Sequence, residues 1–326
     1  MNPFNTCISV QKEETKRMAH RHSRNYIQIG APFSHHPIPH PPMKELLDAE
    51  AAKGDYDTTI TLLTGPGGNL ADPDELPAAY LGRARSIRSL PSITLSQNAN
   101  LSKQASSDYQ KALRLTSREE WDTNDEMEAD GAQRNPYAAW EWGMALRNDG
   151  QLDKAAQTHI LASESFKEIG DRARSVISKL DAGIDLAGTE NVGEAVKILK
   201  EGIKSTTLVE GRDIDLLQRV IAKEGEARVA LASLLWSNNE KAAAEAELGE
   251  ACGRFDQLQA DADVREKARI KSGAGPLVKM KKLAFTIDDT VGTEGSCSRF
   301  KSDKFLDSLS WPKSLQDKFA KLNKLA

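Results

Sequence analysis

The sequence predicts an all-α protein, an α-α superhelix of about five stacked helix pairs that ends in an irregular C-terminal extension. Small residues recur between Pro136 and Lys167 at spacings where two antiparallel helices would cross: Gly143, Gly150, Ala155 and Ala162. A matching set follows about one repeat further along the chain: Gly183, Ala195 and Gly202, with the larger Leu199 among them. Small side chains let helix backbones approach closely, so this repetition indicates adjoining helical hairpins.

Composition is that of a protein that folds in water. Of 326 residues, 39% are hydrophobic and 28% are charged, and no apolar run approaches the roughly 20 residues of a membrane-spanning helix. The three cysteines, Cys7, Cys252 and Cys297, are odd in number and form no C-x-x-C pair. We therefore expect neither a disulfide framework nor a cysteine zinc site, and Cys252, which lies among apolar residues, is expected to be a small core residue.

Charge is unevenly distributed along the chain. Residues 264–326 hold fourteen Lys or Arg against seven Asp or Glu, so with a net charge of −4 the residues before them carry −11. A basic tail on an acidic body favours an anionic partner, such as an acidic protein, a lipid surface or RNA. The alternative is a solvated tail that folds back on the acidic solenoid.

Residues 1–42 lack the repeat pattern and are interpreted as a targeting or disordered leader. No acid occurs between Glu14 and Glu45, whereas Arg, Ser, His and Pro are frequent, as in organelle transit peptides. The proline cluster also fits a disordered leader, so both alternatives stay open. The run 35–40 contains three His, but its prolines extend the backbone and no Cys or carboxylate assists, so no metal site is expected.

The helical repeat domain is predicted over residues 43–262. Its first pair spans 43–63 with Gly54 and Asp55 in the turn, and a glycine-rich linker at 65–68 follows. The second pair spans 76–115 and carries an insertion at about 90–101, which is expected to form a loop.

The segment 119–130 holds seven acids in twelve residues. Like charges at this density repel one another, so a mobile acidic loop is predicted. Docking on a basic partner surface or weak binding of divalent cations are the alternatives.

The third and fourth pairs, at 136–170 and 176–209, are the clearest. Gly170 is suited to end one helix and Asp171 to cap the next. A fifth pair is expected over 216–258. Residues 263–326 form a basic extension whose amphipathic end is predicted to cap the last repeat.

The units at 136–170 and 176–209 resemble the tetratricopeptide repeat family, and those near 43, 76 and 216 do so more weakly, so that about two thirds of the chain is covered. Further segments are similar to tetratricopeptide-like proteins of plant and algal plastids: Asn135-Pro136-Tyr137, 140–146, 166–172, 296–301 and Trp311-Pro312. Members of that group are regarded as scaffolds, which implies a binding role.

In this repeat class the first helix of each pair lines a concave groove. The resemblance therefore implies these partner-binding residues: Tyr137, Trp140, Met144, Arg147, Ile177, Leu180 and Ile184. Such an apolar face favours a hydrophobic helix or an extended apolar segment as ligand. The alternative is that the chain's own tail fills the groove through Phe305, Trp311 and Phe319. His159 takes a place that normally holds a large packing side chain and is expected to be structural.

The sequence contains no G-x-S-x-G, H-E-x-x-H or dinucleotide-binding pattern, so catalytic residues, metals and cofactors are not predicted. The leading hypothesis is a non-enzymatic scaffold or adaptor that binds a partner protein during assembly or maintenance of a plastid complex, with the cytoplasm as the alternative location. A second hypothesis is an accessory subunit that contacts RNA or an anionic membrane through tail lysines: Lys279, Lys281, Lys282, Lys301 and Lys304.

Overall fold

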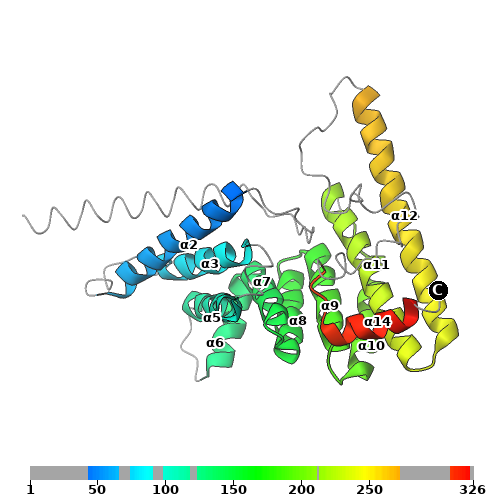
Figure 1. Cartoon of the computed structure of the whole chain (residues 1–326), viewed down its shortest axis with the longest axis horizontal. Helices are drawn as coiled ribbons and strands as arrows, with labels where there is room; N and C mark the ends of the chain where they lie inside the picture. The colour runs from blue at the N-terminus through cyan, green and yellow to red at the C-terminus, as the bar shows by residue number, and fades with distance from the viewer. Residues whose placement is uncertain are drawn as a thin grey trace, which may run out of the picture. The chain divides into compact units, whose positions relative to one another are not determined.

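The computed structural model describes residues 43–65, 74–90, 98–117, 123–210, 213–271 and 309–323. Within these ranges the regular structure is helical and no β-strand occurs, which confirms the all-α prediction (Figure 1). None of the helices found there combines the length and the apolar character needed to cross a bilayer. The chain divides into two compact units, the first extending to Ala145 and the second starting at Leu146.

The first unit stacks its helices in sequence order. It contains α2 (Met43–Thr64), α3 (Glu75–Arg88), α5 (Ala99–Thr116), α6 (Asn124–Arg134) and most of α7 (Pro136–Asn148). α2 packs on α3, α3 on α5 and α5 on α6, as expected of a helical solenoid. The second predicted pair is thereby confirmed as α3 and α5.

The first predicted pair is wrong, because α2 is a single helix. Gly54 and Asp55, expected in a turn, lie inside it, and the Thr58 hydroxyl donates to the carbonyl oxygen of Gly54 at 3.1 Å. A glycine inside a helix costs only about 1 kcal/mol relative to Ala, so tertiary packing can outweigh it. That packing is close: a Cβ on Gly82 of α3 would lie 2.2 Å from the ring of Tyr56 on α2.

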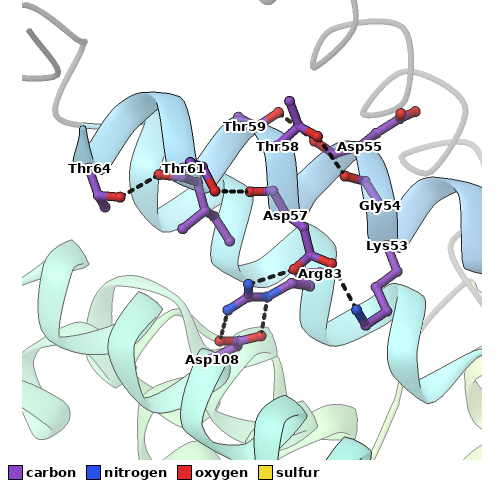
Figure 2. A network of polar contacts seen from close by, with 11 residues as sticks. Lys53, Gly54, Asp55, Asp57, Thr58, Thr59, Thr61, Thr64, Arg83 and Asp108 are labelled. Carbon is purple, nitrogen blue, oxygen red and sulfur yellow. Dashed lines mark hydrogen bonds and ion pairs between the residues drawn. The ribbon is translucent and has the colours of Figure 1, made fainter. Parts of the chain in front are cut away.

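A polar network joins α2, α3 and α5 (Figure 2). Arg83 donates to Asp57 at 2.8 Å and, through two nitrogens, to Asp108 at 2.6 and 2.7 Å. Asp57 also accepts from Lys53 at 2.8 Å. Burial acts to raise the pKa of Asp57, but the hydrogen bonds from Lys53 and Arg83 outweigh it and hold this pKa below its ordinary value. At Asp108 burial outweighs the hydrogen bonds from Arg83 and raises the pKa of that carboxyl. The network thus ties three helices together through hydrogen bonds between Arg83 and two carboxylates.

The predicted acidic loop is wrong from residue 124 onward, where α6 begins. Thr123 and Glu126 form a capping box, in which the Thr123 hydroxyl accepts from the Glu126 N–H at 3.3 Å and the Glu126 carboxylate accepts from the Thr123 N–H at 3.1 Å. Acids in the first turn are favoured by the helix dipole. Glu128, further along, is buried and accepts from Arg114 at 2.8 Å. Residues of α5 thus compensate negative charges on α6 that would otherwise repel one another.

The second unit contains the remaining helices. They are α8 (Leu152–Glu168), α9 (Arg172–Ala187), α10 (Val192–Thr206), α11 (Ile214–Ser237), α12 (Lys241–Lys271) and α14 (Lys313–Asn323). Each helix from α8 to α12 packs on the next, α9 also packs on α11, and α14 packs on α11. Helices occupy the positions predicted for the fourth and fifth pairs. α12 continues to Lys271, so the predicted boundary between residues 262 and 263 falls inside a helix.

The turns and crossings follow the sequence signals. Gly150 and Gly170 have φ angles of 77° and 80° at the ends of α7 and α8, a conformation that favours glycine. The Asp171 side chain accepts from the backbone N–H of Arg174 at 3.0 Å and so caps α9. A Cβ on Gly183 would lie 2.7 Å from Leu199, which confirms that α9 and α10 cross closely there.

Several predictions fall outside the described residues. They concern the leader at 1–42 with its run at 35–40, most of the linker at 65–68 and of the insertion near 90–101, Phe305, the segment 296–301, and the tail lysines named above.

Candidate binding face on helices α9 and α11

The residues predicted to line a groove are, with one exception, buried. Tyr137 on α7 is 42% exposed, whereas the others are at most 7% exposed: Trp140, Met144, Arg147, Ile177, Leu180 and Ile184. Tyr137, Trp140 and Met144 belong to the first unit, and the remaining four belong to the second. Partner binding by this set stays a prediction, and burial assigns most of its members a packing role in the isolated chain.

Contacts within the second unit explain this burial. A Cβ on Gly202 of α10 would lie 2.6 Å from Leu180, so Leu180 faces its own repeat. Ile177 packs in a small apolar cluster with Val220 of α11. Leu180 and Ile184 belong to the main core cluster of the unit. These side chains therefore join neighbouring helices in the folded chain.

Arg147, at the end of α7, is buried in an ion-pair network. Its Nε donates to Asp185 and its Nη2 donates to Asp181, at 2.9 Å to the carbonyl oxygen and 3.1 Å to the carboxylate. Burial acts to lower the pKa of Arg147, but the charges of Asp185 and Asp181 outweigh it and raise this pKa. The guanidinium therefore stays charged and is engaged inside the protein.

His159 of α8 and Lys223 of α11 extend the same network. His159 is fully buried, and its Nδ1 lies 2.6 Å from the Asp185 carboxylate. Lys223 pairs with Asp181 at 3.0 Å and with Glu226 at 2.7 Å. The sequence signal for the network is two acids one turn apart, Asp181 and Asp185, among the buried apolar residues of α9. Three charged side chains on α9 and α11 are thus held by buried cations, which fixes the two helices relative to each other.

The C-terminal segment is seated on α9 and α11 (Figure 1, α14 in red). Its buried apolar side chains belong to the same core cluster as those of α9 and α11: Leu309, Trp311, Leu315, Phe319 and Leu322. Leu315, Phe319 and Leu322 are spaced by four and three, which places them on one side of α14, and Trp311 lies just before the helix, four residues ahead of Leu315. Trp311 and Phe319 meet edge to face with ring centroids 6.0 Å apart. α14 is therefore an amphipathic helix with its apolar side buried.

Three polar contacts fix the position of this segment. The Trp311 indole donates to Glu226 of α11 at 2.9 Å. Ser314 donates to the carbonyl oxygen of Gly188 at 2.5 Å, and Lys318 donates to that of Ala187 at 2.8 Å. A Cβ on Gly188 would lie 2.4 Å from Pro312, so only glycine allows this approach.

We call this surface the α9–α11 face and define it by Ala187, Gly188 and Glu226. α9 and α11 are the first helices of the fourth and fifth predicted pairs, the helices expected to line a groove. The structure thus places Trp311 and Phe319 against this layer, in agreement with the alternative that the tail fills it. Sequence reasoning identified the apolar side of α14 but missed Glu226 and the two carbonyl oxygens.

Cys252 of α12 departs from its expected role. It is half-buried and disulfide-bonded, so the interpretation as a mere small core residue is wrong. The number of cysteines and their spacing in the sequence do not show which of them pair, because a disulfide depends on how close two cysteines lie in the fold.

A scan against protein-family models and searches of curated proteins and of solved structures gave no match. Among the described residues, no group of three or more His, Cys, Asp or Glu side chains is arranged to hold a metal ion.

Proposed function

We propose that this chain is a non-enzymatic scaffold of the tetratricopeptide type that binds a helical segment of a partner protein on the α9–α11 face. The observation that supports the proposal is the occupant of that face: α14 and Trp311, which precedes it, lie there with four regularly spaced apolar side chains buried. A surface that accepts one amphipathic helix has the shape and chemistry to accept another.

Polar groups of the face also provide specificity. Glu226 accepts a hydrogen bond from an indole N–H, the carbonyl oxygen of Ala187 accepts from a Lys side chain, and that of Gly188 accepts from a Ser side chain. Buried aromatic anchors dominate the energy of most protein interfaces, while polar groups set position. In this proposal a partner supplies its own aromatic anchor near Glu226. Tyr137, the exposed member of the predicted set, is a separate contact point on the first unit.

The proposal includes a role in assembly or maintenance of a plastid complex. Its support is the resemblance of the repeat segments to plastid proteins and the acid-poor residues after Glu14. Expression of the full chain with a C-terminal fluorescent protein in plant cells tests it: fluorescence in plastids is expected, and fluorescence confined to the cytoplasm rejects this part.

Affinity capture with the full chain, from an extract of the source organism, tests the binding role. Two glycines provide a matched pair of variants. Gly188→Arg puts a bulky cation where Pro312 approaches and beside Leu152 of α8, so retained helical circular dichroism has to show that the variant is folded. A side chain at Gly193 meets nothing within 4 Å, so Gly193→Arg is the control. We expect a partner to be enriched by the wild type and by Gly193→Arg and to drop at least tenfold with Gly188→Arg. Equal enrichment by both variants, or none by the wild type, contradicts the proposal.

A further inference from the structure

We propose that α14 is an internal competitor for the α9–α11 face and is displaced by a partner helix with the same recognition pattern. The pattern is a Trp, apolar residues four, eight and eleven positions after it, and a Lys seven positions after it. This inference rests on the proposed function and names the chemistry of its partner. In the C-terminal segment these places are Trp311, which precedes α14, and Leu315, Phe319, Leu322 and Lys318 of α14.

The apolar part of the pattern follows from burial. Leu315 is fully buried and Trp311, Phe319 and Leu322 are nearly so, all within the core cluster shared with α9 and α11. The opposite side of α14 is in solvent, where Lys313 and Asp317 form an ion pair with side chains 80% and 62% exposed. Recognition therefore depends on one side of the helix, which a different chain can reproduce.

The polar part of the pattern consists of two hydrogen-bond donors, one at each end of the contact. Lys318 donates to the Ala187 carbonyl oxygen at the C-terminal end of α9, where the helix dipole is negative and backbone acceptors lack partners inside the helix. An acidic side chain at that place would be repelled. Near the start of α14, Glu226 accepts from the Trp311 N–H, so phenylalanine there would leave a buried acceptor with one donor fewer.

Exchange is possible because the other helices keep their contacts with one another when α14 leaves. α9 packs on α10 and α11, and α11 packs on α12, without α14 between them. α14 itself has 11 residues, and an isolated helix of fewer than about 12 residues is marginal in water, so its order depends on the face that holds it. Tethering in the same chain gives α14 a high effective concentration there, which weakens the apparent affinity of any competitor.

The test measures binding of a fluorescent peptide with the sequence of residues 308–323 to the full chain, by fluorescence anisotropy. Leu315→Asp places a charge in the buried side of α14 and releases it, whereas Ala320→Asp places the same charge on an exposed position. We expect the Leu315→Asp chain to bind the peptide at least tenfold more tightly than the wild type or the Ala320→Asp chain. A peptide with Lys318→Glu should bind that chain at least tenfold more weakly, and one with Lys321→Glu, an exposed position, should bind as the unchanged peptide does.

Hydrogen exchange on the wild-type chain supplies a measurement that needs no variant. Excess peptide should accelerate exchange of the α14 amides while α9 and α11 stay protected. Absence of that acceleration, together with no peptide binding to a Leu315→Asp chain whose helical circular dichroism is retained, shows that α14 is a permanent part of the core. If a partner is nevertheless captured and lost with Gly188→Arg, the scaffold function stands and this inference alone fails.

Discussion

The indole N–H of Trp311 donates to the carboxylate of Glu226 across 85 residues of sequence, and both side chains are buried. The other carboxylate oxygen of Glu226 is 2.7 Å from Lys223, which in turn pairs with Asp181. A chain of contacts thus runs from the C-terminal segment through α11 to α9.

Trp311→Phe keeps an aromatic ring and removes this donor. We expect the free energy of unfolding to fall by about 1–2 kcal/mol, because a hydrogen bond to a buried charged acceptor is lost. Urea denaturation measures the change. A double-mutant cycle with Glu226→Gln should give a coupling above about 0.5 kcal/mol, and additive effects would show that the pair does not interact energetically.

Arg147 provides the second prediction. Arg147→Met should lower the free energy of unfolding by about 3–5 kcal/mol, since it leaves the buried Asp181 and Asp185 carboxylates without their principal cation. Adding Asp185→Asn should recover part of that loss. If Arg147 were instead a surface contact for a partner, its replacement would change stability by less than about 0.5 kcal/mol in the same denaturation experiment.

The positions of the clearest helices could be predicted because their signals are local. A glycine with positive φ ends α7 and α8, Asp171 caps α9, and Gly183 admits Leu199 at a crossing. Each of these features, a helix end, a cap or a close crossing, depends on residues within a few turns of each other or on the absence of a side chain. Features of this kind can be recognised in a single sequence.

The errors have the opposite character. The sequence predicts a loop where α6 forms, because its acids repel one another locally, while Arg114, which neutralises Glu128, lies on α5. The sequence likewise predicts a turn at Gly54 inside α2, because the packing that outweighs the glycine comes from α3. In both cases a partner distant in sequence decides the outcome.

The candidate site divides in the same way. Spacing alone indicated the apolar side of the C-terminal segment, with Trp311 and Phe319. The position at which this segment packs depends on Glu226 and on backbone carbonyl oxygens at the end of α9. No pattern of residues in the sequence identifies these acceptors. The groove set inferred from repeat positions included Arg147, which the acids of α9 hold inside the fold.

Two glycines test the close crossing of α9 and α10. Gly183→Ala should destabilise the protein by about 1–3 kcal/mol, since its Cβ would lie 2.7 Å from the buried Leu199 side chain. Gly253→Ala on α12 should stabilise it by up to about 1 kcal/mol, because nothing lies within 4 Å and alanine favours a helix. Thermal unfolding compares the two, and equal effects would mean that the crossing is loose.

Tyr109 gives the first unit a measurable pH dependence. Burial, with the charge of Glu141, raises the pKa of Tyr109 to about 12, and Arg88 and Arg85 oppose this shift only in part. The neutral phenol is favoured in the folded state, so its contribution to stability is complete below the unfolded pKa of about 10 and is lost as pH rises through about 12. Near-ultraviolet absorbance should show one of the five tyrosines ionising in this late phase. Tyr109→Phe should remove the phase, and its persistence in that variant would contradict the assignment.

Cys252 offers a chemical count. The chain has three cysteines, and the disulfide at Cys252 occupies two of them. Protein unfolded without reductant should therefore expose one free thiol in a thiol-reagent titration, and three after reduction. Cys252→Ser removes one cysteine and releases its partner, so two free thiols are expected both before and after reduction. Three free thiols in the unreduced wild-type chain would show that Cys252 is not bonded. If the two remaining cysteines of the variant joined each other within one chain, no free thiol would be left before reduction. One free thiol in the unreduced variant, together with a mass above that of the monomer, would show a bond between two chains instead.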